Sequence, residues 1–275
     1  MDEQAAAVAT WRAARDVRLR SPDGWLALVG LHWLVQGENH VGAHPANQVV
    51  LHGHEIPPRV GSLWVDGDRV RLVPHAGVEV LHAGKPVGEV VLEDDRNEHP
   101  TVLELGTLRF HLIRRGDRLG VRVRDTSAPA LARFKGLDSF PIDPAWRVTA
   151  RLGAATPGAS VETIDITGEP TRIPCAGVLS WQQGGATWHL DAVHGDEDGS
   201  LWLIFGDATN GTDTYGGGRY LYTDPPLPDG SVTVDFNLAY NMPCAFSAYA
   251  TCPLPPPQNR LPIRVEAGER IYRAP

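Results

Sequence analysis

Hydrophobic and polar positions follow two different patterns along this chain. Residues 2–20 are rich in Ala, Arg, Glu and Gln and lack Gly and Pro, which favours a helix. Trp11 and Ala14 are expected to share one face of that helix. The sequence "SPDG" at 21–24 is expected to end it, because Pro and Gly interrupt helices.

From Trp25 onward, short runs of aliphatic, β-branched and aromatic residues alternate with Gly, Pro, Asn and Asp. These runs predict strands joined by tight turns, and turn signals about every 8–12 residues are typical of a β-sandwich or barrel. The sequences "VDGD" and "RRGDR" are expected to form hairpin turns in which Gly supplies a positive φ angle. The acidic sequence "HGDEDGS" at 194–200 is also interpreted as a hairpin loop.

The later part of the chain contains a connecting segment and a Pro-rich end. Residues 126–150 are interpreted as a connecting segment that returns to a strand at Trp146. From Asn241 onward the chain is Pro-rich, but interleaved Cys, Phe, Tyr and Leu indicate an ordered coil packed across a sheet.

The sequence therefore predicts a mainly β protein in three parts. These are a helix at 1–20, a sandwich-like β domain at 21–135, and a barrel- or sandwich-like β domain at 136–275 that the Pro-rich coil closes. Whether the two β-rich halves share one core stays open.

Composition narrows the classes of partner. The formal net charge is −8, whereas nucleic-acid binding would need a basic surface. The apolar run "GWLALVGLHWLV" is about half a membrane span, and residues 1–20 lack the apolar centre of a signal peptide. We therefore expect a cytoplasmic protein that binds neither nucleic acid nor a membrane. The three Cys residues are an odd number and are expected to be thiols.

Several stretches spread over nearly the whole chain carry a resemblance to a known family. They are "GWLALVGLHWLVQGENHVG", "FKGLDSFPIDPAWRV", "FGDATNGTDTYGGGRYL", "VDFNLAYNMPCAF" and "TCPLPPPQNRLPIRVEAGE". In these the chain resembles the domain of unknown function 1684 family, which is bacterial and archaeal and has no assigned activity. One position departs from the family pattern, because Met242 stands where a Pro is usual. The resemblance implies kinship and leaves the function open.

A second resemblance concerns residues 37–125. The sequences "VGAHPANQVVL", "GDRVRLV", "HAGKPV" and "LELGTLRFHLIRRGD" resemble a forkhead-associated domain. Such domains are β-sandwiches that bind phosphothreonine through an Arg after the first Gly and through a Ser and an Asn further on. Here Ala43 follows Gly42, and the Ser-x-x-His sequence has no counterpart. The resemblance therefore implies the sandwich fold without phosphothreonine binding.

Candidate chemistry concentrates in the Gly-rich stretch "FGDATNGTDTYGGGRYL" at 205–221. An apolar strand is expected to end at Asp207, and three Gly residues precede Arg219. Consecutive Gly residues let the backbone approach a ligand, and Arg219 would bind its carboxylate or phosphate. The alternative is a long hairpin in which Arg219 pairs with Asp207 or Asp235.

The stretch "DFNLAYNMPCAF" supplies a second group of polar side chains beside an apolar strand. Asp235 and Asn237 lie two residues apart and are expected to share one strand face. Cys244 would be a nucleophile if a neighbour lowers its pKa, or else a small buried core residue. Cys244 and Cys252 lack the spacing of a zinc knuckle.

The Pro-rich end supplies a third group. Asn259 and Arg260 follow a Pro run and would either close over a ligand or pin the coil to the strands. Glu269 would pair with Arg219 or act as a base. His52 and His54 have the spacing of two metal ligands, but the Gly between them indicates a turn, so no metal site is predicted.

These groups lead to two functional hypotheses. The first is a cytosolic small-molecule enzyme, with hydrolysis as the simplest reaction, whose pocket is formed by 207–219, 235–244 and 259–269 and takes an anionic substrate. The second is a non-catalytic binding module for an anionic ligand or a peptide. The candidate catalytic residues are Asp207, Asp235 and Cys244. The candidate ligand-binding residues are Thr209, Thr214, Tyr215, Gly217, Arg219, Asn237, Tyr240, Asn241, Asn259, Arg260 and Glu269. The cofactor and the oligomeric state are unknown from the sequence.

Overall fold

The computed structural model describes residues 3–195 and 199–274, so the centre of the acidic loop predicted at 194–200 lies outside the described residues. The chain divides into two compact units. The inserted unit is Leu19–Phe134, and the C-terminal unit joins Met1–Arg18 to Lys135–Pro275. Each unit has its own hydrophobic core.

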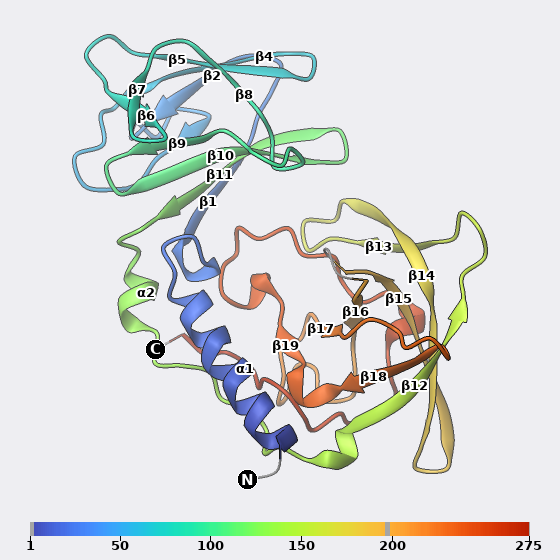
Figure 1. Ribbon diagram of the computed structural model, residues 1–275. Helices are drawn as coiled ribbons and strands as arrows, with labels where there is room; N and C mark the ends of the chain where they lie inside the picture. Colours follow the sequence, from blue (N-terminus) through green and yellow to red (C-terminus); the bar gives the residue numbers. More distant parts are fainter. Residues whose placement is uncertain (1–2, 196–198, 275) are drawn as a thin grey trace. The chain divides into compact units, whose positions relative to one another are not determined.

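The predicted N-terminal helix is confirmed as α1 (Glu3–Leu19). Its buried positions include Val8 and Arg15, which lie seven residues apart and therefore face the same way. Trp11 is half-buried, with its ring centroid 6.1 Å from that of Tyr240. Ala14 is exposed, so it does not share a buried face with Trp11; it lies about 100° around the helix from the buried Arg15. Figure 1 shows α1 running beside the part of the C-terminal unit that contains β19 (Tyr240–Asn241).

The inserted unit contains two β-sheets with a core of Val, Leu and Phe side chains, and its sandwich-like architecture is as predicted. The six-stranded sheet has the order β1 (Leu28–Trp33), β11 (Arg118–Asp125), β10 (Leu108–Arg115), β9 (Val102–Leu105), β6 (Val80–His82) and β7 (Lys85–Val87). The five-stranded sheet has the order β3 (Val49–Val50), β2 (Gly37–Gly42), β4 (Gly61–Asp66), β5 (Arg69–Pro74) and β8 (Val90–Leu92). The short helices are η1 (Trp25–Ala27) and α2 (Pro129–Arg133).

Two predicted hairpin turns are present in the inserted unit. Gly67 has a φ of 57° between β4 and β5, and Gly116 has a φ of 55° between β10 and β11. A residue with a Cβ is disfavoured at such φ values, which explains Gly at both turns.

The C-terminal unit is built on one open antiparallel sheet. Its order is β18 (Ser231–Asp235), β12 (Arg147–Ala154), β14 (Pro170–Gln183), β15 (Ala186–His194), β16 (Leu201–Phe205), β17 (Arg219–Thr223) and β19, and β13 (Ser160–Ile164) pairs with β14. Short 3₁₀ helices are η2 (Pro144–Trp146), η3 (Phe236–Leu238), η4 (Pro243–Ala245) and η5 (Pro257–Asn259). Of the two predicted architectures for this half, the open strand order excludes a closed barrel among the described strands.

The Pro-rich coil is ordered and closes this sheet, as predicted. It follows β16 by backbone hydrogen bonds, because Gly206 N donates to Asn259 O and Leu261 N donates to Gly206 O at 2.9 and 2.8 Å. It also reaches β13, where Leu254 N donates to Ile164 O at 2.9 Å. The coil therefore satisfies backbone groups at the end of two strands.

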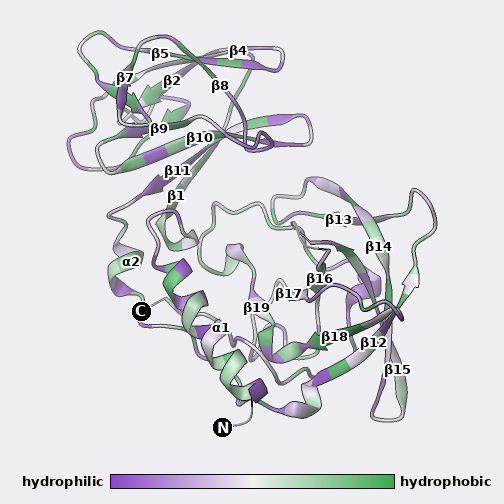
Figure 2. Ribbon diagram, in the orientation of Figure 1, coloured by the Kyte–Doolittle hydropathy of each residue, from purple (hydrophilic) through white to green (hydrophobic). Residues whose placement is uncertain are grey.

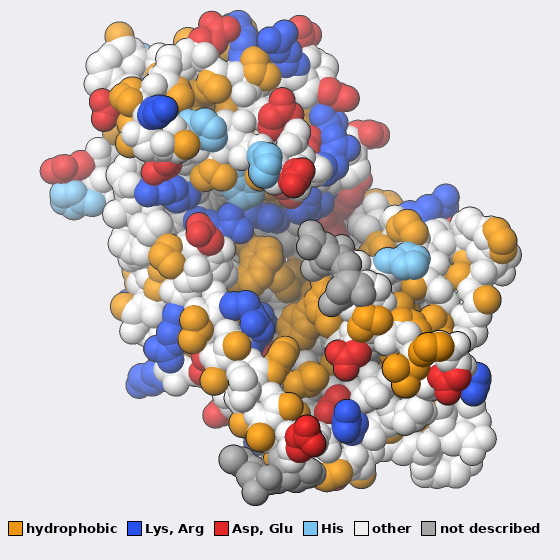
Figure 3. Space-filling model, viewed as in Figure 1, with side chains coloured by type: hydrophobic (Ala, Val, Ile, Leu, Met, Phe, Trp, Pro, Cys, Tyr) orange, Lys and Arg blue, Asp and Glu red, His pale blue; other side chains and the backbone are white. Residues whose placement is uncertain are grey.

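The distribution of hydrophobic and charged residues on this fold can be followed in two further views. Figure 2 shows hydrophobic and hydrophilic positions following one another along the strands and along α1. Acidic and basic side chains both occur over the face seen in Figure 3, within a net charge of −8. In the described part of the chain, no helix combines the length and the apolar composition needed to span a bilayer.

Candidate functional site

Arg219 and Asp207 form a fully buried ion pair. Arg219 begins β17, Asp207 follows β16, and the antiparallel register of these strands brings the two side chains together. Nη2 of Arg219 donates to Oδ2 of Asp207 at 2.7 Å, and neither side chain is exposed. The same nitrogen donates to Val265 O at 2.8 Å, and Nη1 donates to Ala267 O. Burial lowers the pKa of the Arg219 guanidinium, and the negative charge of Asp207 opposes that shift.

The second carboxylate oxygen of Asp207 also accepts hydrogen bonds from within the protein. Oδ1 accepts hydrogen bonds from Thr209 N at 2.8 Å, from Thr209 Oγ1 at 2.6 Å and from Val265 N at 3.2 Å. Thr209 Oγ1 is in turn 2.8 Å from Thr214 Oγ1. Both Thr side chains are buried. The stretch thus has the geometry of the hairpin alternative, in which Arg219 pairs with Asp207 and the Thr hydroxyls bond locally.

The Gly residues of this stretch allow close packing within the protein. Gly218 has a φ of 109°, and a Cβ there would lie 2.8 Å from Phe205 O and closer still to the Pro255 ring. At Gly217 a Cβ would lie 2.5 Å from the Tyr215 ring. Two of the three Gly residues therefore accommodate a side chain or a carbonyl of this chain.

Asp235 and Asn237 are hydrogen-bonded, although not as neighbours on one strand face. β18 ends at Asp235, whose Oδ1 accepts from Asn237 N at 3.0 Å and thereby caps η3. Asn237 Nδ2 donates to the same oxygen at 2.8 Å and to Asp143 O at 2.9 Å. The expected shared strand face is wrong, because the cap turns the chain into a 3₁₀ helix. Oδ2 of Asp235 accepts from Gln4 of α1 at 3.0 Å.

Glu269 pairs with Arg15 of α1. Oε1 of Glu269 lies 3.0 Å from Arg15 Nε, and Oε2 accepts from Asn241 N at 2.6 Å. Burial raises the pKa of Glu269, and the charge of Arg15 opposes that shift. The Arg15 guanidinium also lies over the Tyr240 ring, 4.7 Å from its centroid.

Asn241, Tyr240 and Glu269 thus lie together. Sequence reasoning missed Arg15, although its position seven residues after Val8 on the helix is a signal that could have found it.

Asn259 and Arg260 are neighbours in sequence with different surroundings. Asn259 is 1% exposed. Its Oδ1 accepts from Asp191 N at 2.8 Å, and its Nδ2 donates to Asp191 O and Ile204 O at 2.9 and 3.0 Å. Asn259 therefore pins the coil to β15 and β16. Arg260 is exposed, and its Nη2 donates to Pro255 O at 3.2 Å.

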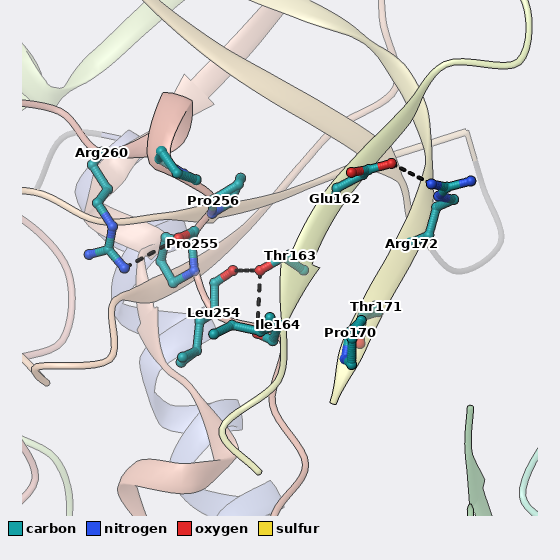
Figure 4. A pocket seen from close by; sticks show the side chains of 11 residues that line it. Glu162, Thr163, Ile164, Pro170, Thr171, Arg172, Leu254, Pro255, Pro256 and Arg260 are labelled. Carbon is teal, nitrogen blue, oxygen red and sulfur yellow. Dashed lines mark hydrogen bonds and ion pairs between the residues drawn. The ribbon is translucent and has the colours of Figure 1, made fainter. Parts of the chain in front are cut away.

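Arg260 lines a groove of about 600 Å³ beside the Pro-rich coil. Figure 4 shows Leu254 and Ile164 between Arg260 on one side and the Glu162–Arg172 ion pair on the other. The lining residues are Glu162, Thr163, Ile164, Pro170, Thr171, Arg172, Leu254, Pro255, Pro256, Pro257 and Arg260. Of the predicted site residues, only Arg260 lines this groove. Sequence reasoning missed its other wall, because an exposed hairpin such as β13–β14 has no distinctive residue pattern.

Cys244 and Tyr215 lie together at a different place. Cys244 is half-buried in η4, and its backbone N donates to Sγ of the buried Cys252 at 3.1 Å. Hydrogen bonds from the Cys252 thiol and from the Tyr215 hydroxyl lower the pKa of Cys244, while burial opposes the shift.

The candidate residues therefore occupy three kinds of surroundings: buried polar clusters, an accessible groove and a thiol pair. Hydrogen bonds link 207–219 to the 265–267 backbone and link Asn241 to Glu269. Among the described residues, no group of three or more His, Cys, Asp or Glu side chains could hold a metal ion.

Comparisons with known proteins give a family without an activity. A family model described as "Protein of unknown function (DUF1684)" matches residues 132–270. The solution structure of an uncharacterized protein of Haloarcula marismortui is 38% identical over 50% of this chain and 77% of that chain, with a TM-score of 0.41. The FhaA FHA domain, solved in complex with the intracellular domain of Rv3910, is 20% identical over 34% of this chain and 97% of that chain, with a TM-score of 0.25. A search of the curated proteins finds no match.

Proposed function

The chain belongs to the DUF1684 family of proteins of unknown function, and we propose that its C-terminal unit is a binding module for a small organic anion with an apolar body. The ligand occupies the groove beside the Pro-rich coil, with its anionic group on Arg260. A volume of about 600 Å³ lies within the range of small-molecule sites.

The proposal rests on the hydrogen bonding and the ion pairing of Arg260. This exposed guanidinium donates one hydrogen bond, to Pro255 O, and forms no ion pair with any residue of 3–195 or 199–274. The other arginine of the groove, Arg172, is 2.5 Å from Glu162. Because a guanidinium presents five N–H donors, Arg260 has donors left for a carboxylate or a phosphate.

The groove walls suit an apolar body. Ile164 is 52% exposed, a large fraction for an Ile side chain, and it lies beside Leu254 in Figure 4. Three consecutive prolines, Pro255, Pro256 and Pro257, follow Leu254 on the coil and form its part of the groove wall. Proline fixes the backbone φ angle, so this wall loses little conformational entropy when a ligand binds.

The first hypothesis from the sequence, a hydrolase with Asp207 or Asp235 as general base, receives less support. A base must reach the proton that it removes, either directly or through one water molecule. Both oxygens of Asp207 accept hydrogen bonds inside the protein, and its side chain has no exposed surface. Asp235 accepts from Asn237 and Gln4 and is 8% exposed.

A thermal-shift comparison tests the binding module. Octanoate, octyl phosphate and octanol share one apolar chain and differ in the charge of the end group. We expect both anions to raise the melting temperature of the wild type more than octanol does, because ligands that bind the folded state stabilise it. In Arg260→Gln the advantage of the anions over octanol should disappear.

Arg264→Gln is the matched control. Arg264 lies on the same coil and is also exposed, but it pairs with Asp213 and Glu266 and does not line the groove. This variant should keep the advantage of the anions. Equal shifts by octanol and the anions in the wild type, or an unchanged anion advantage in Arg260→Gln, would overturn the proposal.

A further inference from the structure

Cys244 and Cys252 are placed to react with each other. The backbone N of Cys244 is 3.1 Å from Sγ of Cys252. Since the N–Cα bond is about 1.46 Å, that sulfur lies within about 4.6 Å of Cα of Cys244. A disulfide needs the two sulfur atoms about 2.0 Å apart, and Sγ of Cys252 already lies against the backbone of Cys244, so this proximity permits a bond with little movement of the backbone.

The two thiols differ in accessibility. Cys244 is half-buried, whereas Cys252 is 3% exposed. The neighbouring Cys252 thiol and Tyr215 hydroxyl lower the pKa of Cys244, which favours its thiolate. The adjacent Cys244 thiol and burial raise the pKa of Cys252. An oxidant in solution therefore meets Cys244 first, and the neighbouring sulfur is a protected thiol.

We propose that Cys244 and Cys252 are a covalent modification site, at which a peroxide oxidises Cys244 and Cys252 then closes an intramolecular disulfide. This inference is independent of the groove and of Arg260.

The chemistry balances with peroxide as the only co-reactant. The Cys244 thiolate attacks one peroxide oxygen, the O–O bond breaks, and with hydrogen peroxide the departing hydroxide takes up a proton to become water, leaving a sulfenic acid. The Cys252 sulfur then loses its proton and attacks the Cys244 sulfur. The S–O bond breaks, and hydroxide leaves with that proton as a second water. Two thiols are oxidised by two electrons, and the peroxide is reduced.

The sequence makes the test direct. No Lys or Arg lies between Arg219 and Arg260, so trypsin releases both cysteines in one peptide, 220–260. Cys175 falls in the peptide 173–219 and is an internal control, because its thiol donates to Gly177 O rather than to another thiol. The full chain is treated with hydrogen peroxide, alkylated, digested and analysed by mass spectrometry.

We expect the peptide 220–260 to lose both alkylation sites and two hydrogen atoms, while Cys175 remains alkylatable. A reductant should restore both sites. In Cys252→Ser, Cys244 should stop at a sulfenic acid that dimedone traps, and in Cys244→Ser no disulfide should form in the peptide 220–260.

Three results would overturn the proposal. They are oxidation of Cys175 as fast as Cys244, retention of two free thiols in the peptide 220–260 when Cys175 is already oxidised, and disulfides between chains on a non-reducing gel. Each result is read from the wild type, so the proposal stays testable even if a variant fails to fold.

Discussion

Arg219 donates a 2.7 Å hydrogen bond to Asp207 at a place where neither side chain is exposed. The guanidinium also donates to the carbonyls of Val265 and Ala267. One buried cation thereby joins the beginning of β17, the turn after β16 and the C-terminal coil. A buried pair of this kind contributes mainly through the large cost of removing one partner.

Asp207→Ala should therefore lower the free energy of unfolding by about 3–5 kcal/mol, because it leaves the Arg219 charge buried without its partner. Urea unfolding followed by circular dichroism measures this loss. Glu162→Ala is the control, because Glu162 pairs with Arg172 while both side chains are about 70% exposed. If both variants lose the same free energy of unfolding, burial of the Asp207–Arg219 pair does not make its loss more costly than that of an exposed pair.

Asn259→Ala should lower the free energy of unfolding by about 2–3 kcal/mol, since it leaves buried backbone groups without hydrogen-bond partners. These groups are the N–H and carbonyl of Asp191 and the carbonyl of Ile204. Gln258→Ala removes an exposed neighbouring amide and should change stability little. A stable Asn259→Ala protein with altered anion binding would instead favour a direct ligand contact by Asn259.

Ala substitutions at two Gly residues with positive φ can distinguish the stability cost of backbone strain from that of close packing. Gly211 has a φ of 83°, and a Cβ added there would meet no atom within 4 Å, whereas a Cβ at Gly218 would meet Phe205 O at 2.8 Å. We expect Gly211→Ala to cost about 1 kcal/mol and Gly218→Ala about 3 kcal/mol or more. Equal losses in thermal or urea unfolding would show that close packing at Gly218 contributes nothing beyond strain.

His111 should make the inserted unit less stable in acid. Burial, together with the charges of Arg124 and Arg122, lowers the pKa of His111 from 6.5 to about 4. Above pH 6.5 neither the folded nor the unfolded state binds this proton. As the pH falls below 6.5 the unfolded state binds it first, so stability is lost progressively on the way down to pH 4.

The loss attributable to His111 should reach about 3 kcal/mol at pH 4. His111→Gln cannot titrate and should show a smaller drop in unfolding free energy between pH 7 and pH 4 than the wild type. Urea unfolding at both pH values measures the difference, and identical drops in the two proteins would contradict the prediction.

Local patterns predicted the elements of this fold well. The alternation of apolar runs with Gly and Pro identified the strands, and Gly67 and Gly116 occupy the predicted turns because their φ angles are positive. Glu3–Leu19 forms the predicted helix because this stretch lacks both Gly and Pro. These features depend on neighbours in sequence, which a single chain displays directly.

The candidate site could be predicted only in part. The sequence offered Asp207, Asp235 and Glu269 as partners for Arg219, and Asp207 is the one that pairs with it. The other acceptors of that guanidinium are backbone carbonyls 46 and 48 residues away. Every residue has a backbone carbonyl, so residue type does not tell which carbonyl accepts a given hydrogen bond. Arg15 meets Glu269 across 254 residues, a separation over which residue pattern gives no register. The groove at Arg260 depends likewise on the approach of β13 to the coil.

The Arg15–Glu269 contact has a consequence for how the chain folds during synthesis. The C-terminal unit takes its first segment from residues 1–18 and its remainder from residues 135–275, so the whole inserted unit emerges between them. The inserted unit is contiguous and can fold first on the ribosome. Helix α1 cannot form its contact with Glu269 until that residue has left the exit tunnel. Until then Arg15 lacks the carboxylate with which it pairs in the native protein.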